Sequence, residues 1–365
     1  MTDLELNVSL RTDFYNSLFS NIQFDKQRNA VNVFDDLEEE YKTLYDGVAL
    51  RDISHFGLIE LQGKEVLDFL NRVSTNSLKE LQSDFSEVTL FTNEKGRIIE
   101  RSTVINFGET ILLVGSDYFK HKLFSWINKY IIMEDIKIYD VTGKYAFYEL
   151  LGPQADSFST LIFDSDIDAL TPNQFKSFRV DNEDYFVIKK KEFDINKYWI
   201  IGKTSQGNEL IKYMMEHKSV FDFRLVGEKA FDKFRIEKGI PAVPNELNDF
   251  YNPYEAGLIN EVSFTKGCYI GQEVIARLDT YDKVQKNLCG ILFNSGENPE
   301  GNLTIFEDKR EVGNITSVTY SSLWKTNIGL AYIKKDFNDD GKILIAKSEN
   351  GIEYPVTLTS LPFKK

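Results

Sequence analysis

The stretch VSFTKGCYIGQEVIAR, residues 262–277, is the most distinctive part of this sequence. It opens with a short apolar run that favours a strand, continues through Lys266, Gly267 and Cys268, and then favours a helix that starts near Gly271. A cysteine just before a helix N-terminus lies in the partial positive charge of unpaired backbone amides, and Lys266 adds a cation, so both favour the thiolate. This placement makes Cys268 a candidate reactive thiol.

Two interpretations remain open for the residues around this thiol. Gly267 and Gly271 allow the backbone to approach a ligand closely, and Gln272 and Glu273 add an amide and a carboxylate in the first helical turn. These groups suit a heterocyclic ligand. Alternatively, Cys268 is a small buried residue and Glu273 only complements the helix dipole, which is the more common outcome for such residue types.

The rest of the chain alternates between strands and helices before it ends in strands alone. Hydrophobic periodicity predicts two consecutive α+β regions, about 57–131 and 136–217, and a further helix over 227–240. From residue 288 onward, short apolar segments alternate with glycine or asparagine turns, as in a small barrel or sandwich. The sequence therefore predicts a separate C-terminal β domain.

Composition restricts the classes of function. The chain has 365 residues and a formal net charge of −14, so its field repels phosphate backbones and argues against broad nucleic-acid binding. No apolar run reaches the roughly eighteen residues of a membrane helix, and the N-terminus has no secretory pattern. We therefore expect a cytoplasmic protein without a membrane partner.

The sequence also argues against several kinds of resident site. Cys268 and Cys289 are too few for a disulfide scaffold or for an iron–sulfur cluster, which usually needs more thiolates. The histidines lie far apart, with no carboxylate or cysteine at ligand spacing, so no resident metal is expected. No glycine-rich phosphate loop occurs, which argues against nucleotide hydrolysis.

Three neighbouring segments, 231–247 (FDKFRIEKGIPAVPNEL), 252–258 (NPYEAGL) and 262–277, together resemble the signature region of the YgfZ family of folate-binding proteins. That family is related to the T-protein aminomethyltransferases. Residues 44–71 resemble the N-terminal region of T-proteins and residues 312–333 their C-terminal barrel, so the similarity spans about residues 44–335.

The resemblance implies an α+β fold, a T-protein-like multi-domain ring with two α+β domains and a C-terminal small β-barrel. We expect residues 1–50 together with 136–250 to form one split α+β domain and residues 51–135 to form an inserted α+β domain. Residues 251–287 would be the signature segment, and residues 288–365 the barrel.

The resemblance also implies a function. Tetrahydrofolate or a derivative would be held near the centre, and the chain would be an accessory protein for iron–sulfur cluster assembly or repair, affecting tRNA-modifying and other cluster enzymes. Its partners would be folate and iron–sulfur assembly or client proteins. By position in the motif, Cys268 is the expected catalytic residue, and the expected folate-binding residues are Lys266, Tyr269, Gln272, Glu273, Arg235 and Glu100.

Two departures from the T-protein pattern bear on the reaction. Glu100 and Arg101 occupy the place of an aspartate pair, and a shift of about 1 Å in a catalytic group can cost about a hundredfold in rate. Trp199 stands near the place of a pterin-binding glutamate, and its indole offers one donor and a stacking face instead of two acceptors. These differences favour the accessory role. The alternatives are a folate-dependent aminomethyltransferase or demethylase that uses Glu100, and an interaction module that has lost the ligand.

Overall fold

The structure of the chain is a computed structural model that describes residues 3–118, 120–281, 284–296 and 298–363. Backbone contacts divide it into two compact units, each of which gathers three stretches of sequence. Unit 1 comprises Met1–Phe69, Leu78–Val88 and Ser102–Asp232. Unit 2 comprises Leu70–Ser77, Thr89–Arg101 and Lys233–Lys365.

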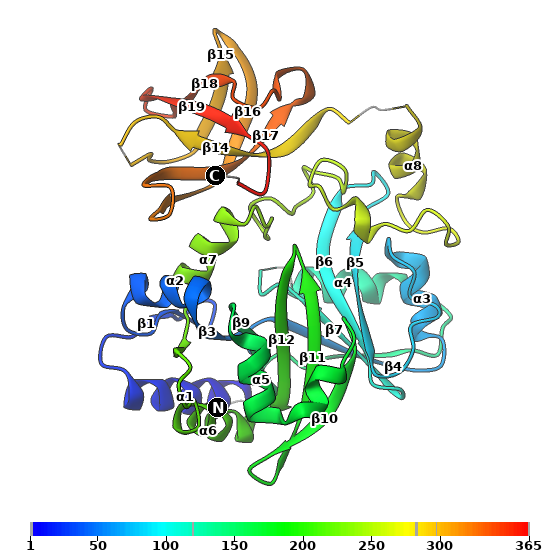
Figure 1. Cartoon of the computed structure of the whole chain (residues 1–365). Coiled ribbons are helices and arrows are strands. Elements are labelled where there is room, and N and C mark those ends of the chain that lie inside the picture. The colour runs from blue at the N-terminus through cyan, green and yellow to red at the C-terminus, as the bar shows by residue number, and fades with distance from the viewer. Residues whose placement is uncertain (1–2, 119, 282–283, 297, 364–365) are drawn as a thin grey trace. The chain divides into compact units, whose positions relative to one another are not determined.

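The larger sheet of unit 1 has six strands in the order β10-β11-β12-β9-β3-β13 (Figure 1). Neighbouring strands are antiparallel except β3 and β13, which are parallel. The strands are β3 (Val48–Asp52), β9 (Tyr145–Leu151), β10 (Phe175–Val180), β11 (Glu183–Glu192), β12 (Ile195–Lys203) and β13 (Phe223–Leu225).

A second sheet has five strands in the order β5-β6-β7-β4-β8. Strands β5 to β7 are neighbours both in the sequence and in the sheet, and β6 and β7 are antiparallel. The strands are β4 (Gly57–Gln62), β5 (Phe85–Thr92), β6 (Ile98–Asn106), β7 (Thr110–Gly115) and β8 (Lys137–Asp140). A small hairpin, β1 (Gln23–Asp25) and β2 (Ala30–Val33), precedes them.

One helix begins where a side chain satisfies the free amides of the first turn. At α2, the carboxylate of Asp36 accepts from the backbone N–H groups of Glu38 and Glu39 at 3.0 and 2.9 Å, as an N-cap residue does. The α-helices are α1 (Asp3–Leu18), α2 (Leu37–Asp46), α3 (Val66–Val73), α4 (Lys120–Tyr130), α5 (Ala155–Phe163), α6 (Gly207–Glu216), α7 (Glu228–Glu237) and α8 (Gln272–Tyr281). Short 3-10 turns are η1 (Ser165–Ala169), η2 (Thr204–Gln206), η3 (Ile259–Glu261) and η4 (Lys335–Phe337).

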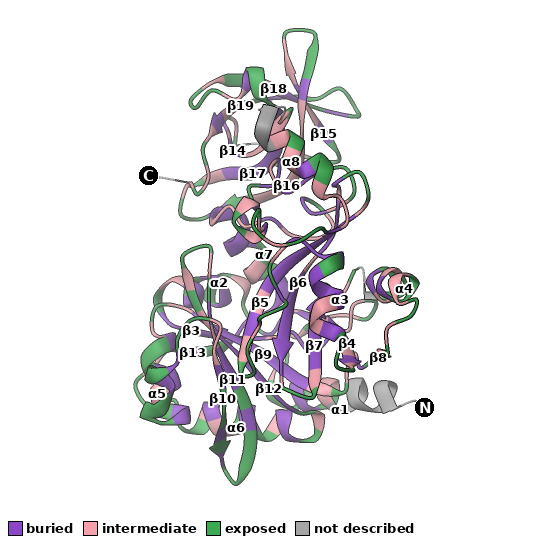
Figure 2. Cartoon of the chain, turned by 90° about the vertical axis from the view of Figure 1, so that its right-hand side faces the viewer, coloured by how far each residue is buried: buried purple, intermediate pink, exposed green. Residues whose placement is uncertain are grey.

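The two faces of the six-stranded sheet are buried against different layers. Because side chains alternate along a strand, Tyr148 and Leu150 of β9 point to one face, where they join a core with residues of α1, α5 and α6. Phe147 and Trp199 point to the other face and pack with residues of the five-stranded sheet, such as Leu112. Figure 2 shows the central strands as buried along most of their length.

The C-terminal part of unit 2 is a closed barrel of six strands in the order β14-β17-β16-β15-β18-β19. This confirms the predicted small β-barrel, and closure leaves no unpaired strand edge. The strands are β14 (Lys286–Phe293), β15 (Leu303–Glu307), β16 (Arg310–Ser321), β17 (Thr326–Lys334), β18 (Ile343–Ser348) and β19 (Glu353–Thr359).

Cys289 is part of the barrel core. Its thiol donates to the side-chain oxygen of Asn338 at 2.8 Å and to the carbonyl of Asn287 at 3.2 Å. Burial raises the pKa of Cys289 to about 12, so this thiol stays protonated.

The apolar run at the start of the signature motif is not a strand, contrary to the prediction from its sequence. Val262 is buried, but Phe264 is 48% exposed, and the residues from 262 to 270 form a loop. The run is too short to extend a sheet, and its backbone N–H groups are bonded elsewhere. Ser263, for instance, donates to the carbonyl of Thr75 at 3.0 Å.

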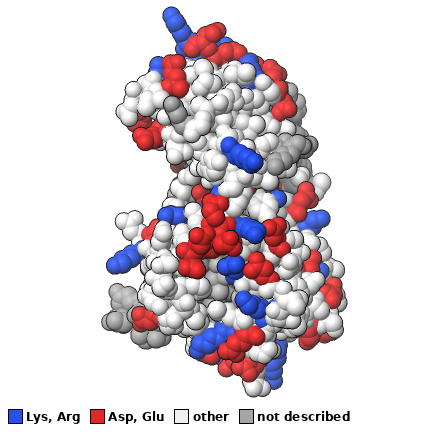
Figure 3. Space-filling view, turned by 60° about the vertical axis from the view of Figure 1, so that its left-hand side comes forward, with Lys and Arg blue, Asp and Glu red and all other residues white. Residues whose placement is uncertain are grey.

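Charged side chains of both signs lie on the face that Figure 3 shows. Acidic residues number 57 against 43 basic ones, and on this face several carboxylates are gathered in one patch with lysines and arginines beside them. The face in view has no extended basic stripe.

Candidate functional site

The start of the signature loop is fixed to the segment that follows α3. The hydroxyl of Thr75 donates to the carbonyl of Glu261 at 2.8 Å, and the backbone N–H of Ser263 donates to the carbonyl of Thr75. The backbone N–H of Thr75 donates to the carbonyl of Leu90 on β5. One residue thus joins the loop to a strand within unit 2.

The end of the loop approaches the β5–β6 turn closely. The hydroxyl of Thr92 donates to the carbonyl of Ile270 at 2.7 Å. Gly271 has a φ of +85°, and a Cβ there would lie 2.6 Å from the carbonyl oxygen of Asn93 and 3.1 Å from the Cα of Gly96. Only glycine allows this approach without strain. Helix α8 then begins at Gln272, where the sequence predicted it.

Lys266 points back into unit 2. Its ammonium donates to the carbonyl of Ser74 at 2.8 Å and to the carbonyl of Asn76, and it lies 5.3 Å from the ring centre of Tyr269. Burial lowers the pKa of Lys266 to about 7. Tyr269 is buried and packs in an apolar cluster with residues such as Leu90. Lys266 and Tyr269 therefore both anchor the loop to the rest of unit 2, whether or not they also contact a ligand.

The three remaining candidate residues of the motif differ in exposure. Cys268 is exposed, so it is not the small buried residue of the alternative interpretation. Gln272 is half-buried. Glu273 is exposed and pairs with Arg277 one turn further along α8, a surface pair of the kind that contributes little to stability.

Glu100 and Arg101 lie on β6 in the same unit. Glu100 is fully buried, and its carboxylate accepts from the backbone N–H of Arg101 at 3.0 Å. The guanidinium of Arg101 binds the carboxylate of Glu261 through Nε at 2.9 and 3.0 Å and through Nη2 at 2.7 Å. Glu100, which stands at the place of a catalytic aspartate, is therefore the sequence neighbour of Arg101, and Arg101 forms an ion pair with Glu261 at the start of the signature loop.

Arg235 is engaged within the protein. Its guanidinium donates to the carboxylate of Glu246 at 3.0 Å, to the hydroxyl of Ser317 at 3.0 Å and to the carbonyl of Ile240 at 3.2 Å. Both charged residues are buried, and Ser317 also donates to Glu246 at 2.7 Å. These contacts give Arg235 a structural role.

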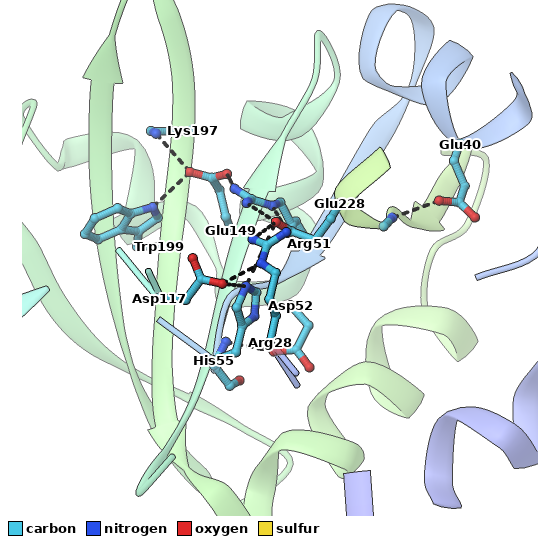
Figure 4. Close-up of polar contacts among 12 residues, drawn as sticks. Arg28, Glu40, Arg51, Asp52, His55, Asp117, Glu149, Lys197, Trp199 and Glu228 are labelled. Atoms are coloured by element: carbon cyan, nitrogen blue, oxygen red, sulfur yellow. Dashed lines mark hydrogen bonds and ion pairs between the residues drawn. The ribbon is translucent and has the colours of Figure 1, made fainter. Parts of the chain in front are cut away.

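Unit 1 holds a second group of ionisable side chains, which we call the buried charge cluster (Figure 4). Three strands place side chains from it in one row, because Arg51 on β3 is paired with Glu149 on β9, and Glu149 with Trp199 on β12. Its members are Arg28, Arg51, His55, Asp117, Glu149, Lys197, Trp199 and Glu228.

Glu149 is the centre of the row. Its Oε1 accepts from the ammonium of Lys197 at 2.8 Å and from the indole N–H of Trp199 at 3.0 Å, and its Oε2 accepts from Arg51 at 3.3 Å. Burial by itself would raise the pKa of Glu149, but Lys197 and Arg51 outweigh it and hold that pKa below its usual value. A negative charge is therefore kept in the interior at neutral pH.

Arg51 joins this row to the start of α7. Its Nε and Nη2 donate to the two carboxylate oxygens of Glu228 at 2.7 and 3.0 Å, the bidentate geometry that suits a planar guanidinium. Its guanidinium carbon lies 3.8 Å from the ring centre of Phe231. Burial would raise the pKa of Glu228, but Arg51 and neighbouring charges lower it to about 2.

The last part of the cluster surrounds His55. Arg28 donates to Asp117 at 2.6 Å and to Glu228 at 2.9 Å, and the Nε2 of His55 lies 3.9 and 4.0 Å from the same two carboxylates. Neither ring nitrogen has a hydrogen-bond partner among the residues described by the structure. Burial lowers the pKa of His55 despite these carboxylates, so the ring is neutral at pH 7.

Sequence reasoning missed this cluster, apart from Trp199. Its members come from segments far apart in the chain, and only the strand register brings them together. One signal was present: YAFYELL has a single charged residue, Glu149, within an apolar strand, and a carboxylate at such a position needs buried partners. Trp199 keeps a polar role, since its indole donates to Glu149.

Two models of protein families match this chain, and both describe domains of the same kind of protein. The model of the GCVT N-terminal domain matches residues 11–266, and that of the glycine cleavage T-protein C-terminal barrel domain matches residues 286–365. No described helix has the length and apolar character that a membrane crossing would need.

Individual relatives agree with the family models. A chloroplastic protein of Arabidopsis thaliana, provisionally named a transferase, is 28% identical over 88% of this chain and 74% of its own length. An aminomethyltransferase of Geobacillus kaustophilus is 28% identical over 83% of this chain and 84% of its own.

A solved structure supports the fold alone. The glycine cleavage system aminomethyltransferase T of Bartonella henselae has a TM-score of 0.77 with this chain at 17% identity, covering 90% of this chain and 89% of its own. This confirms the predicted T-protein-like fold. Both relatives named above are transferases by name, and neither name refers to iron–sulfur clusters.

Proposed function

Because the chain belongs to the glycine cleavage T-protein family, we propose that it is a folate-dependent one-carbon transferase of the aminomethyltransferase type. The observation that carries this proposal is the buried, ionised carboxylate of Glu149, held by Lys197, Trp199 and Arg51. Buried ion networks are costly compared with apolar packing, and perturbed buried acids concentrate at functional sites.

The residues fit a reduced folate. A carboxylate has about four acceptor positions, and Oε2 of Glu149 receives one hydrogen bond in the described structure, at 3.3 Å from Arg51. The N–H groups at the edge of a pterin ring require such an acceptor. By resemblance, Trp199 stands near the place of the pterin-binding glutamate of T-proteins, and Glu149 is the direct cross-strand partner of Trp199. We propose that the carboxylate has moved to the neighbouring strand.

Tetrahydrofolate supplies the nitrogen atoms that carry the one-carbon unit. The residues of the buried charge cluster would bind and orient it. By its position in the sequence, Glu100 is the proposed counterpart of the T-protein aspartate, and its side chain is buried. The longer side chain shifts its oxygen atoms, so the donor of the one-carbon unit need not be that of glycine cleavage.

Calorimetry with tetrahydrofolate tests the proposal first, followed by an assay for methylene- or methyl-tetrahydrofolate with amine and sulfonium donors. We expect Glu149→Gln to weaken folate binding about tenfold to a hundredfold, as for a lost hydrogen bond to a charged group. Glu209→Gln, at an exposed pair with Lys212, is the control. A wild-type protein that binds no tetrahydrofolate would disprove the proposal.

A second candidate is a YgfZ-like accessory role in iron–sulfur cluster assembly or repair in the cytoplasm, with cluster proteins and tRNA-modifying enzymes as clients. The observation that favours it is the exposed thiol of Cys268 on a loop with fixed ends. Cells that lack their own YgfZ-type protein provide the test. If Cys268→Ala restores cluster enzymes as well as the wild type does, the thiol has no part in such a role.

A further inference from the structure

The ion pair between Arg101 and Glu261 has features of a positioning contact. Both nitrogens used by Arg101 lie on one side of the guanidinium, and they bind both oxygens of Glu261 at 2.7 to 3.0 Å. The side chains are 19% and 15% exposed. Two parallel hydrogen bonds fix direction as well as distance, and partial burial limits screening by salt.

The pair joins two segments that matter to the proposed reaction. Arg101 follows Glu100 on β6, so the direction of the Arg101 side chain constrains the backbone that carries the buried acid. Glu261 is the last residue of η3, and its carbonyl also accepts from Thr75. The residue that opens the signature loop is therefore held by both its side chain and its backbone.

The other end of the loop is held independently. Ile270 accepts from Thr92, and Gly271 packs against the β5–β6 turn. Between these ends Cys268 faces solvent. Between the two ends, the side chains of Lys266 and Tyr269 anchor the loop to unit 2.

We propose that Arg101 is a positioning residue, which sets the place of the signature loop relative to Glu100 through its bidentate contact with Glu261. The functional part of this inference rests on the proposed one-carbon transfer. The structural part does not, because it predicts the mobility of a defined loop whether or not folate binds.

Hydrogen exchange over residues 259–271 tests the structural part. In Arg101→Gln and in Glu261→Gln we expect a severalfold faster exchange of this segment, including the amide of Ser263, while the barrel strands exchange as in the wild type. Arg101→Lys keeps the positive charge but loses the planar guanidinium that makes two hydrogen bonds. This variant should therefore exchange more slowly than Arg101→Gln but faster than the wild type. Arg179→Gln, which breaks an exposed bidentate pair with Asp184, is the matched control.

Kinetics test the functional part. Misplacement of a catalytic group lowers kcat more than it raises KM, so Arg101→Gln should lose on the order of tenfold to a hundredfold in kcat with a nearly unchanged KM for folate. The charge-reversed double variant R101E/E261R should recover part of the loss.

The outcomes separate the two proposals. Unchanged exchange in correctly folded Arg101→Gln overturns the positioning role, even if the enzyme is active. A wild type without transfer activity, but with a loop that loosens in the variants, overturns the proposed function and leaves the positioning contact in place. An equal fall in the activity of Arg101→Gln and Arg179→Gln would also overturn the positioning role.

Discussion

His55 is a buried imidazole whose two nitrogens form no hydrogen bond with the residues that the structure describes. Glu228 and Asp117 attract its proton, while Arg51 repels it and Asp52 attracts it more weakly. Burial outweighs the attraction and lowers the pKa of His55. The native state therefore keeps the ring neutral at a pH where the unfolded chain has already bound a proton.

This imbalance predicts a loss of stability in mild acid. As the pH falls below about 6.5, the unfolded state takes up a proton that native His55 does not, so the free energy of unfolding falls by at most about 1.4 kcal/mol per pH unit. The loss ends below the lowered pKa of the native ring. Thermal unfolding between pH 7.5 and 5 should show this slope in the wild type and a weaker one in His55→Gln.

His121 serves as the control for the titration of His55, because it is exposed on α4. The variant His121→Gln should keep the wild-type slope. Equal slopes in the wild type and in His55→Gln would show that the imidazole does not lose its proton on folding.

Among the elements, α8 depends on one glycine for its approach to the β5–β6 turn. Gly271→Ala would place a Cβ 2.6 Å from the carbonyl of Asn93 at a φ of +85°. We expect a loss of about 1–3 kcal/mol in the free energy of unfolding, measured by denaturant titration. Gly267→Ala is the control, since a Cβ there has no neighbour within 4 Å. Similar losses for both variants would contradict this account.

The contact between β3 and α7 depends on the ion pair of Arg51 with Glu228. Glu228→Gln removes the bidentate partner of Arg51 and leaves a buried guanidinium with a weaker acceptor. Breaking a buried pair from one side usually costs about 3–5 kcal/mol, so we expect a clear fall in the unfolding midpoint. Arg179→Gln, in an exposed pair, should leave the midpoint unchanged. A small effect of Glu228→Gln would mean that water replaces the lost partner.

For the whole molecule, the sequence predicted most of the architecture. Strand periodicity and turn residues predicted two α+β regions and a C-terminal β domain, because local patterns determine local structure. They did not predict β3 or β13 of the six-stranded sheet. The start of α8 at Gln272 was also predicted correctly. The four-part domain division, with an inserted domain at 51–135, stays a prediction, and so do the binding roles of Lys266, Tyr269, Gln272, Glu273, Arg235 and Glu100.

The site was less predictable because its contacts are long-range. Arg51, Glu149 and Glu228 are separated by many residues, and no local pattern encodes the register that aligns them. Arg235 belongs to a recognisable motif, but the motif did not indicate its partners Glu246 and Ser317. Sequence motifs thus identified the family, whereas the ion-pair partner of each charged side chain could be identified only from the structure.

The two cysteines differ in one further respect, their fate under oxidation. Cys289 is enclosed in the barrel and bonded to Asn338, while Cys268 is exposed. An oxidant or a small disulfide should therefore modify one sulfur atom per native chain, that of Cys268. Air oxidation should join two chains through Cys268 and should not form a disulfide within one chain. Intact-mass measurement after treatment with oxidised glutathione would show a single adduct, and Cys268→Ser would show none. Two adducts on the folded protein would mean that the barrel opens on the timescale of the reaction.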